Sequence, residues 1–259
     1  MDFWRLVHNE NLKIVLKKST WILTILMIIG SPIVPIFLKL IDIPFSAPDV
    51  IYQSFNLYFI VIMLSLIIAS ESVSSEFSRG TIKLLLIRPW DRWKILLSKY
   101  ISVILFSMAA TIVFVLLNVI FAYILFPASG NSILSAASST PDLVLTVVYN
   151  YIRALVLITV AFMLSSLFRS TALSITISIL LYFSGSTLNG IFRLFLDQEH
   201  REFIKYLLST NLDLTQYFAS PTGTFGMTSL GFSLGVLLVY MIVFIAITWF
   251  SFVKRDVRA

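Results

Sequence analysis

Six long stretches of the chain are apolar on all sides rather than along one face. Five contain no Asp, Glu, Lys or Arg, and the sixth contains only Arg153. Because a hydrocarbon core about 30 Å thick requires about 20 apolar residues in a helix, each stretch is long enough to cross a bilayer. The predicted spans are 19–38, 50–70, 100–126, 143–168, 170–192 and 230–253. The pattern therefore predicts an all-α membrane protein with six transmembrane helices.

The composition excludes the other broad fold classes. Hydrophobic residues make up 58 % of the 259 residues and charged residues 12 %, whereas soluble domains have roughly 45–50 % apolar and roughly 25 % charged residues. Charges this sparse cannot cover a surface exposed to water. Without a cysteine the chain cannot be a secreted disulfide scaffold either. Because no internal repeat or soluble segment of domain size is apparent, residues 1–259 are predicted to form a single transmembrane domain.

Lys and Arg are concentrated in alternate segments between the predicted spans, and they set the predicted orientation. They outnumber Asp and Glu before span one, between spans two and three, and in the C-terminal tail. Cytoplasmic segments of membrane proteins are usually rich in Lys and Arg, so both termini are predicted to be cytoplasmic. The net charge of +6 is therefore explained by the orientation of the chain in the membrane and by contact with membrane lipid. No nucleic-acid partner is expected.

Two segments outside the spans, and a pair of prolines within span one, lead to further predictions. Segment 1–18 mixes charges with Phe3 and Trp4, which is typical either of a cytosolic overhang or of a helix in the membrane interface. Pro32 and Pro35 are expected to bend or end the first span near its outer end, because proline lacks a backbone donor. Segment 197–228, between spans five and six, is expected to be an external insertion with a short amphipathic helix around Tyr206.

The segment between spans two and three, residues 71–99, is too charged to cross the membrane. Its spacing predicts a short amphipathic helix ending at Arg88, because Pro89 disfavours a helical conformation in the residue before it. The alternative is a solvated loop whose basic residues only fix the topology. The apolar face of the predicted helix consists of Phe77, Leu84 and Leu85. Its charged face consists of Glu76, Arg79 and Lys83.

An ordered set of residues runs through the same segment: Glu71, Glu76, Gly80, Thr81, Pro89, Arg92 and Lys99, with an apolar run before the proline. This order resembles the cytoplasmic loop of permease subunits of type-2 ATP-binding-cassette (ABC-2) transporters. In that family, a glutamate at the cytoplasmic end of the second helix is followed by the same series of residue types. The resemblance extends to chain length, to six helices with both termini inside, and to an external helical insertion before the last helix.

The resemblance implies a permease subunit in a bacterial cytoplasmic membrane. It would form the translocation path for ATP-driven export of a peptide antibiotic, a drug, a lipid or an ion. Two permeases, identical or paralogous, would assemble with two copies of an ABC ATPase. Segment 71–99 would be the coupling loop that docks on this ATPase, with Glu76, Arg79, Gly80 and Thr81 at the contact. For Glu71, pairing with a basic residue at the membrane face is the alternative.

ATP hydrolysis is expected to take place in a separate partner subunit. The chain contains no phosphate-binding loop of the form GxxxxGK[ST], so ATP and Mg²⁺ are expected to bind to the partner ATPase. His8 and His200 are the only histidines, and they fall in segments predicted on opposite sides of the membrane. With no cysteine ligand and no HExxH helix, neither a metal site nor an enzyme activity is predicted for this chain.

Two polar residues within the predicted spans are candidates for the translocation path. Arg153 falls inside span four, where a charge usually marks a functional site. If that helix begins later, Arg153 instead reaches outward beside Tyr149 and Tyr151. Asn189 in span five either lines the path or hydrogen-bonds between packed helices. A different class of function is also open, namely an ATPase-independent secondary transporter or a membrane scaffold.

Overall fold

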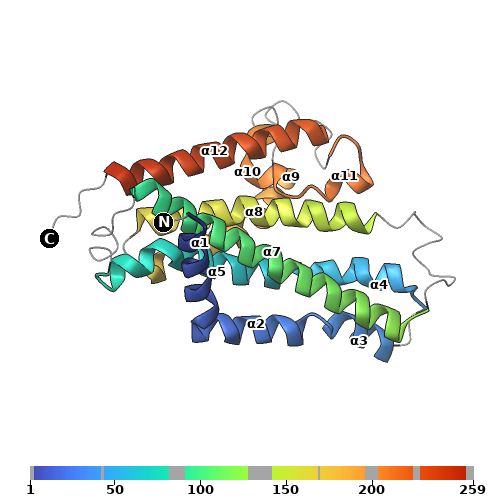
Figure 1. Cartoon of the computed structure of the whole chain (residues 1–259). Coiled ribbons are helices and arrows are strands. Elements are labelled where there is room, and N and C mark those ends of the chain that lie inside the picture. Colours follow the sequence, from blue (N-terminus) through green and yellow to red (C-terminus); the bar gives the residue numbers. More distant parts are fainter. Residues whose placement is uncertain are drawn as a thin grey trace.

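The computed structural model of the chain is a helical bundle (Figure 1). The structure describes residues 3–41, 44–81, 91–127, 142–168, 170–195, 204–223 and 228–254. Within these ranges every regular element is a helix, and six helical segments are long and apolar enough to cross a membrane. They are Lys18–Leu40, Ala47–Ser78, Arg92–Leu125, Leu143–Leu167, Thr171–Ile191 and Leu230–Phe252. The predicted all-α class and the six predicted spans are confirmed.

The first two spans are interrupted, and the last four are single helices. Span one consists of α2 (Lys18–Gly30) and α3 (Ile33–Leu40), and the break falls at Ser31 and Pro32, as the prolines predict. Span two consists of α4 (Ala47–Ser54), the 3₁₀ turn η1 (Phe55–Tyr58) and α5 (Phe59–Ser78). The four single helices are α7 (Arg92–Leu125), α8 (Leu143–Leu167), α9 (Thr171–Phe195) and α12 (Leu230–Lys254).

The described part of the insertion between spans five and six contains short helical elements, but Tyr206 lies in a 3₁₀ turn and not in the short amphipathic helix expected around it. It contains the 3₁₀ turn η3 (Ile204–Tyr206) and the short helices α10 (Leu208–Asn211) and α11 (Gln216–Ala219). Helix α10 packs against α9 and α12, so the insertion caps the bundle rather than standing apart from it.

Helix α5 is the centre of the bundle and packs against α7, α8 and α9. In the most apolar stretch of its span 61 % of residues are buried, compared with 11 % for the span of α12. Polar side chains join the core helices: the Tyr58 hydroxyl lies 2.9 Å from the Thr111 hydroxyl, and Ser70 donates to Ser178 at 2.9 Å. Such bonds satisfy hydroxyl groups that would otherwise be buried without partners in an apolar core.

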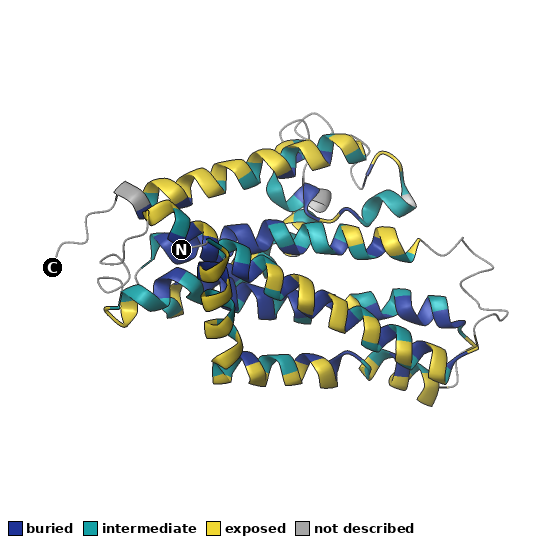
Figure 2. Cartoon of the chain, in the orientation of Figure 1, coloured by how far each residue is buried: buried dark blue, intermediate teal, exposed yellow. Residues whose placement is uncertain are grey.

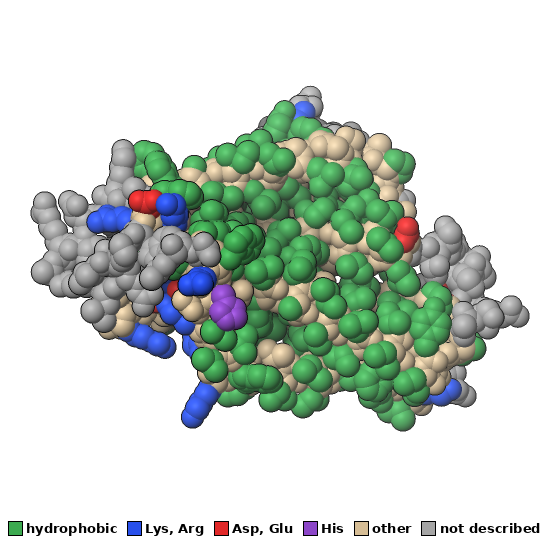
Figure 3. All heavy atoms as spheres, viewed as in Figure 1, with side chains coloured by type: hydrophobic (Ala, Val, Ile, Leu, Met, Phe, Trp, Pro, Cys, Tyr) green, Lys and Arg blue, Asp and Glu red, His purple; other side chains and the backbone are tan. Residues whose placement is uncertain are grey.

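The outer faces of the bundle are apolar. Figure 2 shows exposed residues along α2 and α12 and buried ones along α5 and α8. Hydrophobic side chains cover most of the face seen in Figure 3, and most of the Lys and Arg side chains on that face gather at the end where the N-terminal helix lies. An exposed surface this apolar is stable against lipid rather than water.

The N-terminal helix α1 (Phe3–Leu16) lies across the long helices at one end of the bundle (Figure 1). It buries Leu6 and Val7 and packs on α7, where the Ser102 hydroxyl donates to the Val7 carbonyl at 3.1 Å. Trp4, on the same helix, remains 69 % exposed. Helix α1 is therefore packed onto the bundle, and its placement in the cytosol or in the membrane interface stays a prediction.

Candidate coupling site at the basic end

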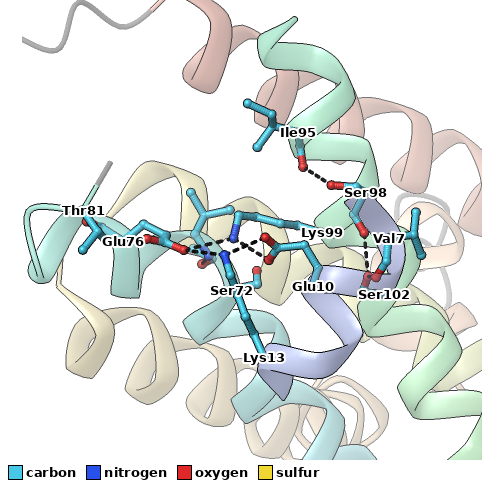
Figure 4. Close-up of polar contacts among 12 residues, drawn as sticks. Val7, Glu10, Lys13, Ser72, Glu76, Thr81, Ile95, Ser98, Lys99 and Ser102 are labelled. Atoms are coloured by element: carbon cyan, nitrogen blue, oxygen red, sulfur yellow. Dashed lines mark hydrogen bonds and ion pairs between the residues drawn. The ribbon is translucent and has the colours of Figure 1, made fainter. Parts of the chain in front are cut away.

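The basic end of the bundle is formed by α1, the C-terminal end of α5 and the N-terminal end of α7. At its centre the side chain of Lys99, on α7, is only 3 % exposed. Its ammonium group lies 2.8 Å from a carboxylate oxygen of Glu10 on α1 and 3.3 Å from one of Glu76 on α5 (Figure 4). A buried lysine is costly unless it is paired, and here two carboxylates from two other helices pair with it.

Lys13 closes this arrangement from the solvent side. Its ammonium group lies 2.7 Å from Glu10 and 3.4 Å from Glu76, and its side chain is 50 % exposed. We call Glu10, Lys13, Glu76 and Lys99 the charge network. It has two positive and two negative side chains from three helices, so it is neutral as a unit and ties α1, α5 and α7 together.

The ionic contacts shift the pKa values of Glu10 and Lys13, the two residues of the charge network that lie on α1. Burial raises the pKa of Glu10, but the nearby charge of Lys99 and hydrogen bonds from Lys13 and Lys99 outweigh it, so the pKa lies below its ordinary value of 4.5. Burial lowers the pKa of Lys13, but the hydrogen bond and charge of Glu10, together with Glu76, leave the pKa above its ordinary value of 10.5. Both groups are therefore charged at neutral pH.

Helix α5 continues further into segment 71–99 than the sequence predicts and ends at Ser78. Gly80 follows with φ +70°, a left-handed conformation that suits glycine and stops the helix. The sequence predicts one amphipathic helix with Glu76, Arg79 and Lys83 on one face. This prediction is wrong for Glu76, because Glu76 belongs to α5, the helix of span two. Residues 82–90, including Pro89, lie outside the described residues.

The structure separates the predicted contact residues into two groups. Glu76 is turned inward, and the Thr81 hydroxyl donates to its carboxylate. Arg79 and Gly80 are exposed at the tip of α5, and Arg92 is exposed at the start of α7. Glu71 pairs with Lys17, which is the alternative expected for it.

Sequence reasoning missed the contribution of the N-terminal helix. Glu10, Lys13 and Lys17 were interpreted only as part of a basic, cytoplasmic segment, yet each pairs with a residue of segment 71–99. The available signal was Glu10, an acid placed three residues before Lys13 in a segment that is otherwise mostly basic and apolar.

An open cavity of about 610 Å³ lies beside the charge network, between α1, α2, α5 and α7. Its wall includes the four network residues, and also Lys17, Glu71 and Arg79. Hydroxyl groups and apolar side chains complete the wall, among them Thr20, Ser72, Ser75, Ile14, Ile68 and Val103. In the described part of the chain, no group of three His, Cys, Asp or Glu side chains is placed to hold a metal ion.

The two candidates for the translocation path have different partners. Helix α8 begins at Leu143, with Asp142 accepting from the Val144 backbone at 2.9 Å, so Arg153 lies about 15 Å along this helix at 1.5 Å per residue. The helix therefore begins at the predicted residue, and whether Arg153 lies within the membrane or reaches outward beside Tyr149 and Tyr151 stays a prediction. The Arg153 guanidinium lies 5.5 Å from the centre of the Tyr182 ring on α9. Asn189 donates to the Ser209 carbonyl at 2.8 Å and thereby joins α9 to α10.

The fold and the charge distribution define the class of the protein, a multi-pass helical membrane protein. The chain belongs to the family described as "Protein of unknown function (DUF2705)", whose model matches residues 14–258. It is 33 % identical over 255 residues to "Uncharacterized membrane protein YdbK" of Bacillus subtilis (strain 168), covering 95 % of this chain and 100 % of that protein. It is also 33 % identical over 227 residues to "Uncharacterized protein YhcI" of the same organism, covering 83 % and 71 %.

Proposed function

We propose that this chain is the permease subunit of an ABC transporter of the ABC-2 type. It acts in a bacterial cytoplasmic membrane with a second permease copy, identical or paralogous, and with a separate ABC ATPase that binds ATP and Mg²⁺. The observation that carries the proposal is the pairing of Glu76 with Lys99 at 3.3 Å. These two residues belong to the ordered set that resembles the ABC-2 loop, and the structure brings them together at the tip of the central helix.

The geometry of the basic end suits a coupling role. Arg79 and Gly80 are exposed directly after the last residue of α5, where a partner protein can reach them. Because α5 packs against α7, α8 and α9, a displacement of its tip acts on most of the bundle. The charge network would carry the same displacement to α1, since Glu76 is shared by Lys13 and Lys99.

The proposed orientation places the basic end in the cytoplasm. Lys and Arg outnumber acids in each segment assigned to that end, and cytoplasmic segments usually carry this excess. In this orientation the charge network faces the compartment that contains ATP. The helical insertion between α9 and α12 then lies outside, and the substrate is exported from the cytoplasm.

Arg153 favours a second candidate function, an ATPase-independent secondary transporter. An ionisable residue within a span often marks a substrate or ion pathway. Its contact with Tyr182, together with Asn189 on the same helix as Tyr182, would then belong to that pathway. The two candidates differ in one measurable requirement, because only the permease needs an ATPase partner.

The structure sharpens the choice of variant for a docking experiment. Charge reversal of Glu76 would disrupt the charge network, so a loss of docking would have two explanations. Arg79 lines the cavity but is exposed and makes no ion pair within the described ranges, so Arg79→Glu removes none of the ion pairs of the charge network. Arg5→Glu is the matched control, because Arg5 is an exposed arginine of α1 that does not line the cavity.

The readout is the amount of ABC ATPase that co-purifies with each tagged variant from its native host. We expect Arg79→Glu to reduce it at least tenfold, because a like charge at a docking contact is repulsive, and Arg5→Glu to leave it unchanged. Equal recovery with both variants would reject Arg79 as a docking residue. Recovery of no ABC ATPase with the unmodified chain would favour the secondary transporter.

A further inference from the structure

The described residues that line the cavity at the basic end have an excess of one positive charge. Four cationic side chains line it, Lys13, Lys17, Arg79 and Lys99, and three carboxylates, those of Glu10, Glu71 and Glu76. Each carboxylate is paired with at least one of the lysines. Among the described residues, Arg79 is the cation of this wall that has no carboxylate within ion-pair distance. The excess charge is thus carried by a side chain that is free to bind an anion.

A second feature of the cavity also favours an anion. Lys17 and Thr20, which flank the first turn of α2, both line the cavity. Lys17 is the N-cap residue of α2, and its side chain makes no capping hydrogen bond. The Thr20 amide is bonded to the Lys17 carbonyl, so what this helix end offers an anion is the positive end of its dipole. The hydroxyl groups of Ser72 and Ser75 supply further hydrogen-bonding partners on the opposite wall.

The surroundings of the cavity indicate that the anion belongs to a lipid. Leu16, at the edge of the cavity, is 76 % exposed, and Trp21 on the next turn of α2 is 56 % exposed. Tryptophan is enriched where a membrane surface meets water, and α2 continues from there as an apolar span. Ile14, Ile68 and Val103 make part of the wall apolar. The cavity therefore opens at the boundary between the polar surface and the hydrocarbon.

We propose that this cavity binds the headgroup of an anionic phospholipid from the adjoining leaflet. The phosphodiester contacts Arg79 and the first turn of α2, and the acyl chains lie along the exposed apolar face of α2. A phosphodiester has one negative charge, which balances the excess of the wall. A zwitterionic lipid brings an additional ammonium group and leaves the excess uncompensated, so anionic lipid binds in preference. The inference concerns the chain alone and does not depend on an ATPase partner.

Native mass spectrometry of the purified chain with phosphatidylglycerol and phosphatidylcholine tests this site. We expect one phosphatidylglycerol per chain, bound at least tenfold more tightly than phosphatidylcholine. Arg79→Gln should weaken phosphatidylglycerol about tenfold, as expected when one charge-assisted hydrogen bond is lost. The matched variant Arg5→Gln, at the same end but outside the cavity, should bind like the unmodified chain. Ser72→Phe should weaken binding without a change of charge, because its ring takes up part of the cavity beside the lipid headgroup.

Three results would overturn the inference. One is equal binding of the two lipids, and another is an equal effect of Arg79→Gln and Arg5→Gln, since both would indicate generic attraction to a basic surface. The third is full displacement of the lipid by millimolar glycerophosphoglycerol, the same headgroup without acyl chains, because the site would then be one for a soluble phosphodiester. Ser72→Phe is interpreted only if its thermal unfolding is unchanged, whereas Arg79 is exposed and its variant is expected to fold normally.

Discussion

The two ends of the molecule hold their polar side chains together by different physical means. The basic end uses the charge network, in which a lysine that is 3 % exposed pairs with two carboxylates. At the opposite end, neutral groups form what we call the outer cluster: Asn211, Tyr217, Thr228 and Ser233. The Tyr217 hydroxyl lies 2.9 Å from Thr228 and 2.6 Å from Ser233, and Ser233 donates to Asn211 at 2.6 Å.

This difference suggests which end is built to respond to other molecules. Ion pairs exchange partners with dissolved ions, charged ligands and protein surfaces, whereas neutral hydrogen bonds are nearly indifferent to salt. The outer cluster fixes the insertion on α12, while the charge network joins three helices through contacts that a charged partner can alter. We therefore expect the outer end to keep its arrangement while the basic end responds to charged partners.

Removing Lys99 should have the largest effect on stability. Lys99→Met leaves Glu10 and Glu76 close together without their buried cation, and breaking a buried ion pair from one side costs about 3–5 kcal/mol. Lys94→Met on the same helix is the control, since Lys94 pairs with Asp91 at the surface and such pairs contribute roughly 0–1 kcal/mol. Equilibrium unfolding in mixed detergent micelles measures both. Similar losses in the two variants would mean that the charge network does not stabilise the fold.

In the outer cluster, Asn211 is the buried residue whose replacement we compare with that of Lys99. Its amide donates to the carbonyls of Lys205 and Leu207, at 2.7 and 2.9 Å, and Asn211 is fully buried. Asn211→Ala leaves these buried groups unsatisfied, which costs about 1–3 kcal/mol. We expect this loss to be the same at low and high salt, whereas the loss in Lys99→Met should shrink at high salt. The exposed variant Asn56→Ala should cost much less, and a salt-dependent loss in Asn211→Ala would contradict the comparison.

Two glycines with positive φ allow the backbones of the two ends to be compared. Gly80 at the basic end has φ +70° and open space around the position of a Cβ, so Gly80→Ala should cost about 1–2 kcal/mol of backbone strain alone. Gly223 at the outer end has φ +66°, and a Cβ there would lie 2.7 Å from the Thr228 hydroxyl. Gly223→Ala should therefore be the more destabilising of the two in the same unfolding assay. The reverse order would contradict the packing of the outer cluster.

The smallest effects are expected from pH near neutrality. The pKa of Glu10 is lowered in the folded chain, so its stabilisation is complete above the ordinary value of 4.5 and is lost as the pH falls through the folded pKa. The pKa of Lys13 is raised, so its stabilisation is complete below 10.5 and is lost as the pH rises through the folded pKa. The contact of α1 with α7 should therefore be constant across the neutral range and weaken only at the extremes. Spin labels on Arg5 and Leu97 report this distance, and a change near pH 7 would argue against the ionic contacts.

The spans could be predicted from the sequence because the signal is local. An uninterrupted apolar run fixes both the helix and its environment, and Pro32 marks the break in the first span for a local reason as well. Span two ends at Ser78, eight residues beyond the predicted end at Ser70, because Glu71 and Glu76 make the following segment look too charged to continue the span. In the structure both acids are paired with lysines, which removes the reason for the helix to end.

The position of α1 could not be predicted, because it depends on contacts between distant residues. Glu10 and Lys99 are 89 positions apart, and nothing in either local pattern indicates that they pair. The contact of Arg153 with Tyr182 could not be predicted for the same reason. The start of α8 follows from the local sequence, but the Tyr182 ring belongs to the next span. For the candidate site, the sequence pointed to Glu76 and Lys99 as members of one ordered set, and the structure adds their ion pairs with α1.

The central claim is that this chain works with a separate ABC ATPase. The most direct measurement is gentle detergent extraction of the tagged chain from its native host, followed by quantitative mass spectrometry of the proteins that co-purify. We expect one ABC ATPase in a one-to-one ratio to the permease chains, whether these are identical or paralogous. A folded, monodisperse preparation that contains no ABC ATPase would contradict it and make Arg153 the next residue to test.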